Sequence, residues 1–131
     1  MMISPKSIIV EPEKWGKTFW DTIETVLYCY DTTDPINCEA VHMFLFSLQY
    51  LLPCPTCRNH YSIYFNQKDI VPLLLDKKKI LEWIYHLQNQ INQRNEKQNR
   101  HSSFEKYLSS LSFRIESSVE EQQHHHQSSK K

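Results

Sequence analysis

The chain has 131 residues, of which 40% are hydrophobic and 23% charged, and this composition predicts one globular domain with tails. Its formal net charge is +0 and its pI is near 7.0, which gives no electrostatic basis for binding nucleic acid or an anionic membrane. Gly16 is the single glycine, so the glycine-rich loops of Rossmann folds and P-loops are excluded.

Two amphipathic helices are predicted in the first half of the chain. The apolar stripe of the first consists of Trp15, Phe19, Trp20, Ile23, Val26, Leu27 and Tyr30. Residues 31–37 contain Asp, Thr and Pro, so they are predicted to form a loop. The second helix ends or kinks at Pro53. Its apolar face consists of Val41, Phe44, Leu45, Leu48 and Leu52.

Three further helices are predicted downstream. Pro55 suits the first turn of a helix that runs through Tyr64, and residues 70–75 form an apolar connector. The next helix covers about residues 77–95, and its inward residues are Ile80, Leu81, Ile84, Leu87 and Ile91. Ser102 and Glu105 form a capping box for a fifth helix.

The predicted fold class is all-α, because strand signals are weak and no two-residue hairpin turn is present. Residues 1–11 are interpreted as an N-terminal extension, 12–116 as the folded domain, and 117–131 as a disordered polar tail. No apolar run has the length of a signal peptide or a membrane span, so we expect a cytoplasmic protein without a direct membrane span.

The sequence Cys54-Pro55-Thr56-Cys57 places two cysteines at a predicted helix N-terminus. The partial positive charge there favours thiolate, the nucleophilic form of cysteine. A CxxC pair serves redox enzymes and zinc sites alike. The other ligands of a zinc site would be Cys29 and Cys38, or histidines such as His60. Cys29 and Cys38 are spaced more widely than a compact ligand pair. A thioredoxin fold would need alternating strands and helices, which are missing.

A second polar group lies on the predicted fourth helix. Trp83, His86 and Gln90 are three and four residues apart, so they are expected to share one face. Asn89 and Asn92 can address one ligand together, although amides in mid-helix are ordinarily solvent-facing.

Three segments, in this order, resemble the Erv/ALR sulfhydryl oxidases, especially their short members from large DNA viruses. Residues 15–20, Trp-Gly-Lys-Thr-Phe-Trp, look like the opening helix, and residues 52–60 are similar to the redox centre. Residues 83–92 look like the family's flavin-binding helix, with its Trp and His-Asn-x-Val-Asn pattern. Gln88 stands where the family usually has histidine, Glu24 where many members have one, and no cysteine follows Cys57.

The resemblance implies an FAD-dependent thiol oxidase folded as a four-helix bundle with a short fifth helix. Cys54 and Cys57 are its catalytic residues, with Cys54 the more exposed sulfur and Cys57 against the flavin. Electrons pass from a protein dithiol through FAD to molecular oxygen, which gives hydrogen peroxide. The residues implied at the cofactor are Trp15, Lys17, Trp20, Glu24, His60, Trp83, His86, Gln88, Asn89, Ile91, Asn92 and Lys97.

The resemblance also implies a homodimer, a thioredoxin-like or small CxxC protein as substrate, and a place in the host cytoplasm or virion. No metal and no nucleic acid are expected. Two alternatives stay open: a zinc-stabilised helical interaction module that uses the four cysteines, and a dimeric scaffold that has lost catalysis. Cys29 and Cys38 are expected to be structural or buried and inert rather than a shuttle pair, because Cys29 ends an apolar helix.

Overall fold

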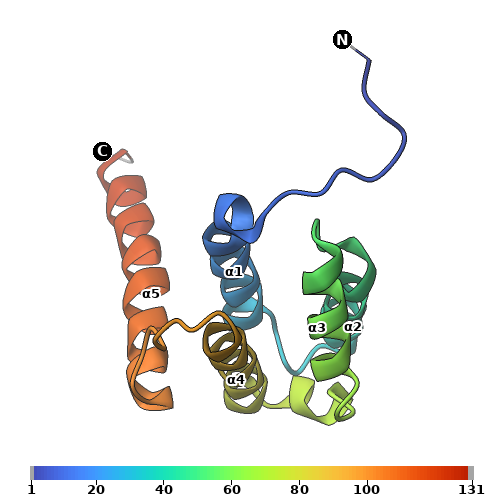
Figure 1. Cartoon of the computed structure of the whole chain (residues 1–131). Coiled ribbons are helices and arrows are strands. Elements are labelled where there is room, and N and C mark those ends of the chain that lie inside the picture. The colour runs from blue at the N-terminus through green and yellow to red at the C-terminus, as the bar shows by residue number, and fades with distance from the viewer. Residues whose placement is uncertain (1, 130–131) are drawn as a thin grey trace. The chain divides into compact units, whose positions relative to one another are not determined.

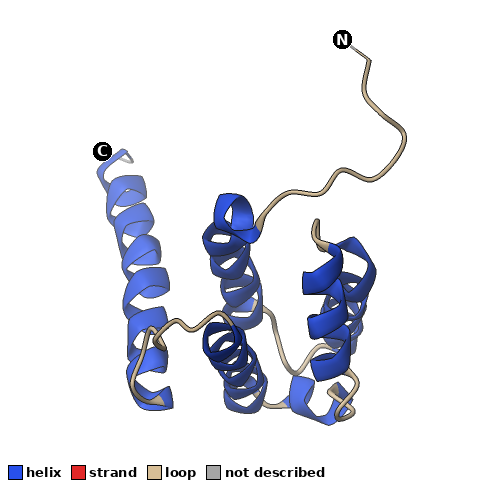
Figure 2. Cartoon of the chain, in the orientation of Figure 1, coloured by secondary structure: helices blue, strands red, loops and turns tan. Residues whose placement is uncertain are grey.

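The structure is a computed structural model that describes residues 2–129, with side chains described up to Val119. Helices and loops make up these residues, and no strand occurs among them (Figure 2). The predicted all-α class is therefore confirmed. The chain divides into two compact units, one ending at Ile80 and the other beginning at Leu81. Residues 2–11 have no regular secondary structure.

The first unit contains the helices α1 (Pro12–Cys29), α2 (Pro35–Leu51) and α3 (Pro55–Phe65) (Figure 1). Each begins with a proline, whose fixed φ suits the first helical position and whose missing N–H would have no helical partner there. In α2 the Asp34 side chain accepts the Ile36 N–H at 2.9 Å. This cap explains why α2 begins inside residues 31–37, which the sequence predicted to be a loop.

The core of the first unit lies where α3 and the short 3-10 helix η1 (Val71–Leu75) pack against α2. Tyr61 and Phe65 stack with their ring centroids 5.9 Å apart, and the Tyr61 hydroxyl donates to the Leu45 carbonyl. The residues buried in this unit include Ile23, Leu27, Val41, Leu45, Leu48, Leu52, Tyr61, Tyr64, Phe65, Ile70, Leu74 and Ile80.

A buried amide ties α2 to α3. Gln49 is only 7% exposed, and its Oε1 accepts from Ser62 Oγ and from Asn66 Nδ2, both at 2.9 Å. Its Nε2 donates to the Phe46 carbonyl at 3.0 Å. The oxygen and the nitrogen of the amide both have hydrogen-bond partners. Gln49 therefore adds directional hydrogen bonds to a contact between α2 and α3 that is otherwise apolar.

A lysine closes the end of α1. Lys77, the first residue of α4 (Lys77–Arg94), donates from Nζ to the carbonyls of Leu27 at 3.1 Å, Tyr28 at 2.9 Å and Tyr30. The same ammonium lies 4.1 Å from the centre of the Tyr30 ring. Carbonyls at a helix C-terminus carry partial negative charge, so a cation at this place stabilises α1.

The second unit contains the rest of α4 and the helix α5 (Phe104–Ser129). An aromatic cluster joins them. The Tyr85 ring lies 5.2 Å from Tyr107 and 5.7 Å from Phe104, and the His101 ring lies 5.6 Å from Tyr107. Leu81, Ile84, Leu87, Leu111 and Ile115 are also buried in this unit.

One expectation for α5 is wrong. The cap is Ser103, whose Oγ accepts the Lys106 N–H at 3.2 Å, so the predicted capping box of Ser102 and Glu105 does not form. The helix is longer than expected and extends to Ser129. The division into a folded domain up to residue 116 and a polar tail from residue 117 stays a prediction, and residues 130–131 of that tail lie outside the described residues.

Candidate active site

The CxxC pair forms the first turn of α3. Cys54 is the N-cap in an extended conformation, and its Sγ accepts the Cys57 N–H at 3.3 Å. Pro55 follows at a position where no N–H is needed. The structure therefore brings the two predicted catalytic cysteines together, and both are free thiols.

Arg58 fixes the corner between α2 and α3. Its Nη1 donates to the Leu52 carbonyl at 2.6 Å, and its backbone N–H donates to the Cys54 carbonyl at 2.9 Å. Leu52 is the C-cap of α2 and Cys54 is the N-cap of α3, so one residue holds both helix ends. The sequence prediction did not include Arg58, because its role depends on a carbonyl outside its own helix.

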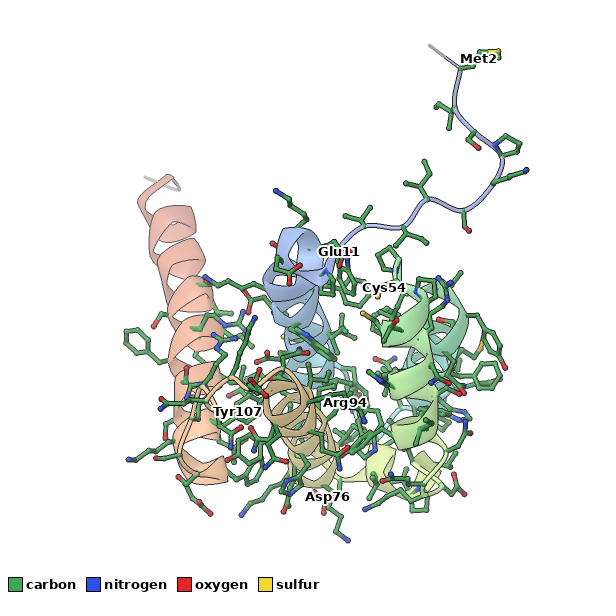
Figure 3. The ribbon with its side chains drawn as sticks, viewed as in Figure 1. Met2, Glu11, Cys54, Asp76, Arg94 and Tyr107 are labelled. Carbon is green, nitrogen blue, oxygen red and sulfur yellow. The ribbon has the colours of Figure 1, made fainter. Side chains whose placement is uncertain are left out.

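The N-terminal segment reaches this corner. The Val10 N–H donates to the Pro53 carbonyl at 2.9 Å, and the Trp15 indole Nε1 donates to the Val10 carbonyl at 2.7 Å. Figure 3 shows the next residue, Glu11, near Cys54. Trp15 was predicted to bind the cofactor, and in the structure its indole N–H holds this segment. Nothing in the local sequence signals the contact of Val10 with the redox motif.

Cys54 is the more buried cysteine of the pair. It is 9% exposed, whereas Cys57 is half-buried. The expectation that Cys54 is the more exposed sulfur is therefore wrong. The physical reason is its capping role, which turns the sulfur back over the first turn of α3 instead of outward.

The environment of Cys57 favours its thiol form. Burial, first, then the hydrogen bond and charge interaction with Cys54, and last the charge of the Glu11 carboxylate together raise the pKa of Cys57 to about 12. A hydrogen bond from the Cys57 backbone N–H acts in the opposite direction. The expected preference for thiolate at the helix N-terminus is thus outweighed at Cys57 by desolvation and by negative charge.

The side chains on α4 divide between buried and exposed positions. Trp83 is 3% exposed and aligns with the apolar residues of α4, whereas His86 and Gln90 are exposed. His86 Nε2 lies 3.5 Å from Glu82 Oε1 on the solvent side. On the continuous helix α4 the steps of three and four residues keep Trp83, His86 and Gln90 near one face, with Trp83 at its buried edge. Their joint role at a cofactor stays a prediction.

The C-terminal half of α4 carries four more predicted cofactor residues, all half-buried: Gln88, Asn89, Ile91 and Asn92. The Lys97 N–H donates to the Asn92 carbonyl at 2.7 Å, and Glu96 adopts a positive φ of 56° in the turn that follows the helix. Lys97 itself is exposed. The half-buried amides therefore lie together within about one turn of one helix.

The remaining predicted cofactor residues belong to the first unit. Trp20 and His60 are half-buried, Glu24 is 3% exposed, and Lys17 is exposed. Lys17, Trp20 and Glu24 are on α1, and His60 is on α3. A shared FAD site built from both units stays a prediction.

The other two cysteines lie at the turn between α1 and α2. Cys38 is half-buried and its Sγ donates to the carbonyls of Thr32 at 3.4 Å and Leu74 at 3.6 Å. Cys29 is exposed, so its expected burial is wrong, because this position points away from the side of α1 that buries Ile23 and Leu27. Both are free thiols, so the structure shows no disulfide between them.

Among residues 2–129, no three His, Cys, Asp or Glu side chains gather in a way that would hold a metal ion. None of the helices in that part of the chain combines the length and the apolar character that a membrane crossing requires.

Comparison with known proteins assigns most of the chain to one family. The model of the Erv1 / Alr family matches residues 17–114. The chain is 26% identical over 86 residues to a protein of Invertebrate iridescent virus 3 and 26% identical over 91 residues to one of Invertebrate iridescent virus 6. A protein of Acanthamoeba polyphaga mimivirus is 26% identical over 86 residues. All three carry the name FAD-linked sulfhydryl oxidase.

These matches cover 65%, 65% and 63% of the present chain, in the same order. They cover 58%, 82% and 59% of the relatives, so the chain spans less than two thirds of the length of two of them.

The charge of Glu11 gives a test of the site. Replacing Glu11 with Gln removes a carboxylate that raises the pKa of Cys57, so the thiolate fraction at a fixed alkaline pH should increase. We expect an increase of up to about fivefold, as for the weak charge pairs of protein surfaces. Iodoacetamide alkylation of Cys57 in the reduced protein, followed by mass spectrometry, measures it. Glu13→Gln changes an exposed carboxylate within α1 and should leave the rate of Cys57 alkylation unchanged. An equal change in both variants would refute the assignment.

Proposed function

Because the chain belongs to the Erv1 / Alr family, we propose that it is an FAD-linked sulfhydryl oxidase that forms disulfides in protein dithiols through Cys54 and Cys57. The observation that carries this proposal is the pair itself. Its two sulfurs belong to one helical turn, and that of Cys54 accepts the backbone N–H of Cys57. The names of the viral relatives support the same chemistry.

The thiol chemistry follows from the pair. In the oxidised protein, a substrate thiolate attacks the sulfur of Cys54, the Cys54–Cys57 bond breaks, and Cys57 leaves with the electron pair. The second substrate thiolate then attacks the substrate sulfur of the mixed disulfide and releases Cys54. The substrate dithiol has become a disulfide, and the Cys54–Cys57 pair has gained two electrons. The raised pKa of Cys57 means that this sulfur takes up a proton after it leaves.

The donor set of α4 fits FAD. FAD, when bound, supplies the acceptor for the two electrons of the pair and hands them to molecular oxygen, which yields hydrogen peroxide. The half-buried amides of Gln88, Asn89 and Asn92 offer paired donors and acceptors of the kind that a ribityl chain or an adenine requires. The buried Trp83 offers an aromatic surface of the kind on which a ring system stacks.

The protein also has a surface that suits a homodimer. Ile36, Met43, Phe46 and Tyr50 are spaced along one side of α2 and are 75%, 63%, 47% and 66% exposed. Large contiguous apolar surfaces are uncommon on soluble monomers. Within α2 only Glu39 carries a formal charge, so a second copy of the same surface would meet little repulsion. We therefore include pairing of two chains through α2 in the proposal.

Replacing either cysteine of the pair should abolish turnover. Cys54→Ser removes the sulfur that is attacked, and Cys57→Ser removes the leaving sulfur, so oxygen consumption with a dithiol should fall to background. Both variants should retain flavin, measured by its absorbance. Cys29→Ser changes an exposed thiol outside the pair and should consume oxygen at the unaltered rate. Near-normal turnover in Cys54→Ser or Cys57→Ser would rule out the mechanism.

Asn92 tests the position of the cofactor. Asn92→Leu removes an amide from the proposed site and leaves a polar group of the ligand without its partner, a loss of about 1–3 kcal/mol. We expect the Kd for FAD to rise by about five- to 140-fold, measured by flavin fluorescence during titration. Gln93→Leu alters the exposed neighbour and is the matched control. Equal affinities in the two variants would place the flavin elsewhere.

The apolar side of α2 gives a test of the dimer. Met43→Lys places a charge in the middle of the surface formed by Ile36, Met43, Phe46 and Tyr50, so the chain should become monomeric in sedimentation velocity experiments. Phe113→Lys makes the same kind of change at a 77% exposed residue of α5 and should leave the chain sedimenting as a dimer. A Met43→Lys protein that sediments as a dimer would exclude this surface.

A further inference from the structure

The N-terminal segment is fastened to the redox corner at one residue. Both backbone polar groups of Val10 are bonded, the N–H to the Pro53 carbonyl at 2.9 Å and the carbonyl to the Trp15 indole at 2.7 Å. The residues before it are open to solvent, with Ile8 65% and Ile9 61% exposed. The exposed residues of the segment are thus followed directly by Val10, which is hydrogen-bonded to the residue before Cys54.

The acceptor of this contact is the middle one of three successive carbonyls. The Leu52 carbonyl accepts from the Arg58 guanidinium and the Cys54 carbonyl accepts from the Arg58 backbone N–H. The Pro53 carbonyl accepts from Val10, which lies 43 residues earlier in the chain. Two of the three carbonyls therefore accept from a donor within the α2–α3 corner, whereas the Pro53 carbonyl accepts from the segment that precedes α1.

A polypeptide substrate needs the same space. Its cysteine must reach the sulfur of Cys54, which is only 9% exposed, and the backbone that flanks this cysteine must pass beside Pro53 and Cys54. An extended backbone that lies beside a free carbonyl donates its own N–H, as in the addition of a strand to an edge. A small dithiol has no such backbone.

We propose that residues 9–11 form a strap that occupies the docking place of a polypeptide dithiol, with the Pro53 carbonyl as the acceptor that strap and substrate share. The inference rests on the proposed function, because it concerns how the substrate of that reaction reaches Cys54. The strap leaves when a polypeptide binds, and it returns when the oxidised product dissociates. Glu11, the last residue of the strap, then also withdraws its negative charge from the neighbourhood of Cys57.

Trapping a peptide on Cys54 tests the strap without any need for flavin or oxygen. In the Cys57→Ser chain, the Cys54 thiolate attacks a short cysteine peptide activated as its thionitrobenzoate disulfide. The peptide becomes joined to Cys54 through a new disulfide, and thionitrobenzoate leaves with the electron pair. Hydrogen exchange of the Val10 amide, followed by NMR, should be slow before the reaction and fast afterwards. Cysteamine activated in the same way should leave the amide slow, because it has no backbone to take the place of Val10.

A Val10 amide that stays protected beside the trapped peptide would overturn the proposal, as would equal loss of protection with cysteamine. These outcomes leave the oxidase function untouched, whereas a wild-type protein without flavin or oxygen consumption would refute the function and not the strap.

A second experiment measures the competition in turnover. Val10→Pro removes the N–H that holds the strap, so kcat/KM for a reduced, unfolded protein should rise roughly two- to tenfold, the range set by one net backbone hydrogen bond. The value for dithiothreitol should change by less. Ile8→Pro alters an exposed residue outside the strap and should change neither value. An equal change for both substrates, no change, or a fall for the unfolded protein would contradict a shared docking place.

Discussion

The arrangement of the redox corner depends on a single constraint, the capping of α3 by the sulfur of Cys54. Pro55 removes the backbone donor at the first helical position, and the sulfur of Cys54 accepts the N–H of Cys57, the third residue of the helix. The sulfur that accepts it is held over the helix turn. The burial of this sulfur and its place beside the N–H of the second cysteine both follow from this arrangement.

The electrostatics of the reduced pair disfavour the thiolate form of Cys57. In dithiol–disulfide proteins, a stabilised thiolate favours the reduced form. At Cys57 burial and nearby negative charge work against the thiolate and raise the pKa to about 12. A reduced pair of this kind gives up its electrons readily, which agrees with a proposed pathway in which a flavin removes them.

The sequence allowed the helices to be predicted well because their signals are local. Prolines at first helical positions and apolar residues at helical spacing lie within each segment, and the order of the motifs identified the family. The errors have a different origin. The burial of Cys54 depends on its capping geometry, the place of Val10 depends on a partner 43 residues away, and the choice between Ser102 and Ser103 as cap is a matter of one residue. Contacts of this kind have no periodicity from which to predict them.

The bonds of Lys77 to the end of α1 have a bearing on the order of folding. They join residues 47 to 50 positions apart, so the chain must close a long loop before they form. The α2–α3 pair, by contrast, joins at Gln49 through bonds that span 13 and 17 positions. We therefore expect the α2–α3 hairpin to act as the folding nucleus, with the last turn of α1 becoming ordered only when the start of α4 arrives.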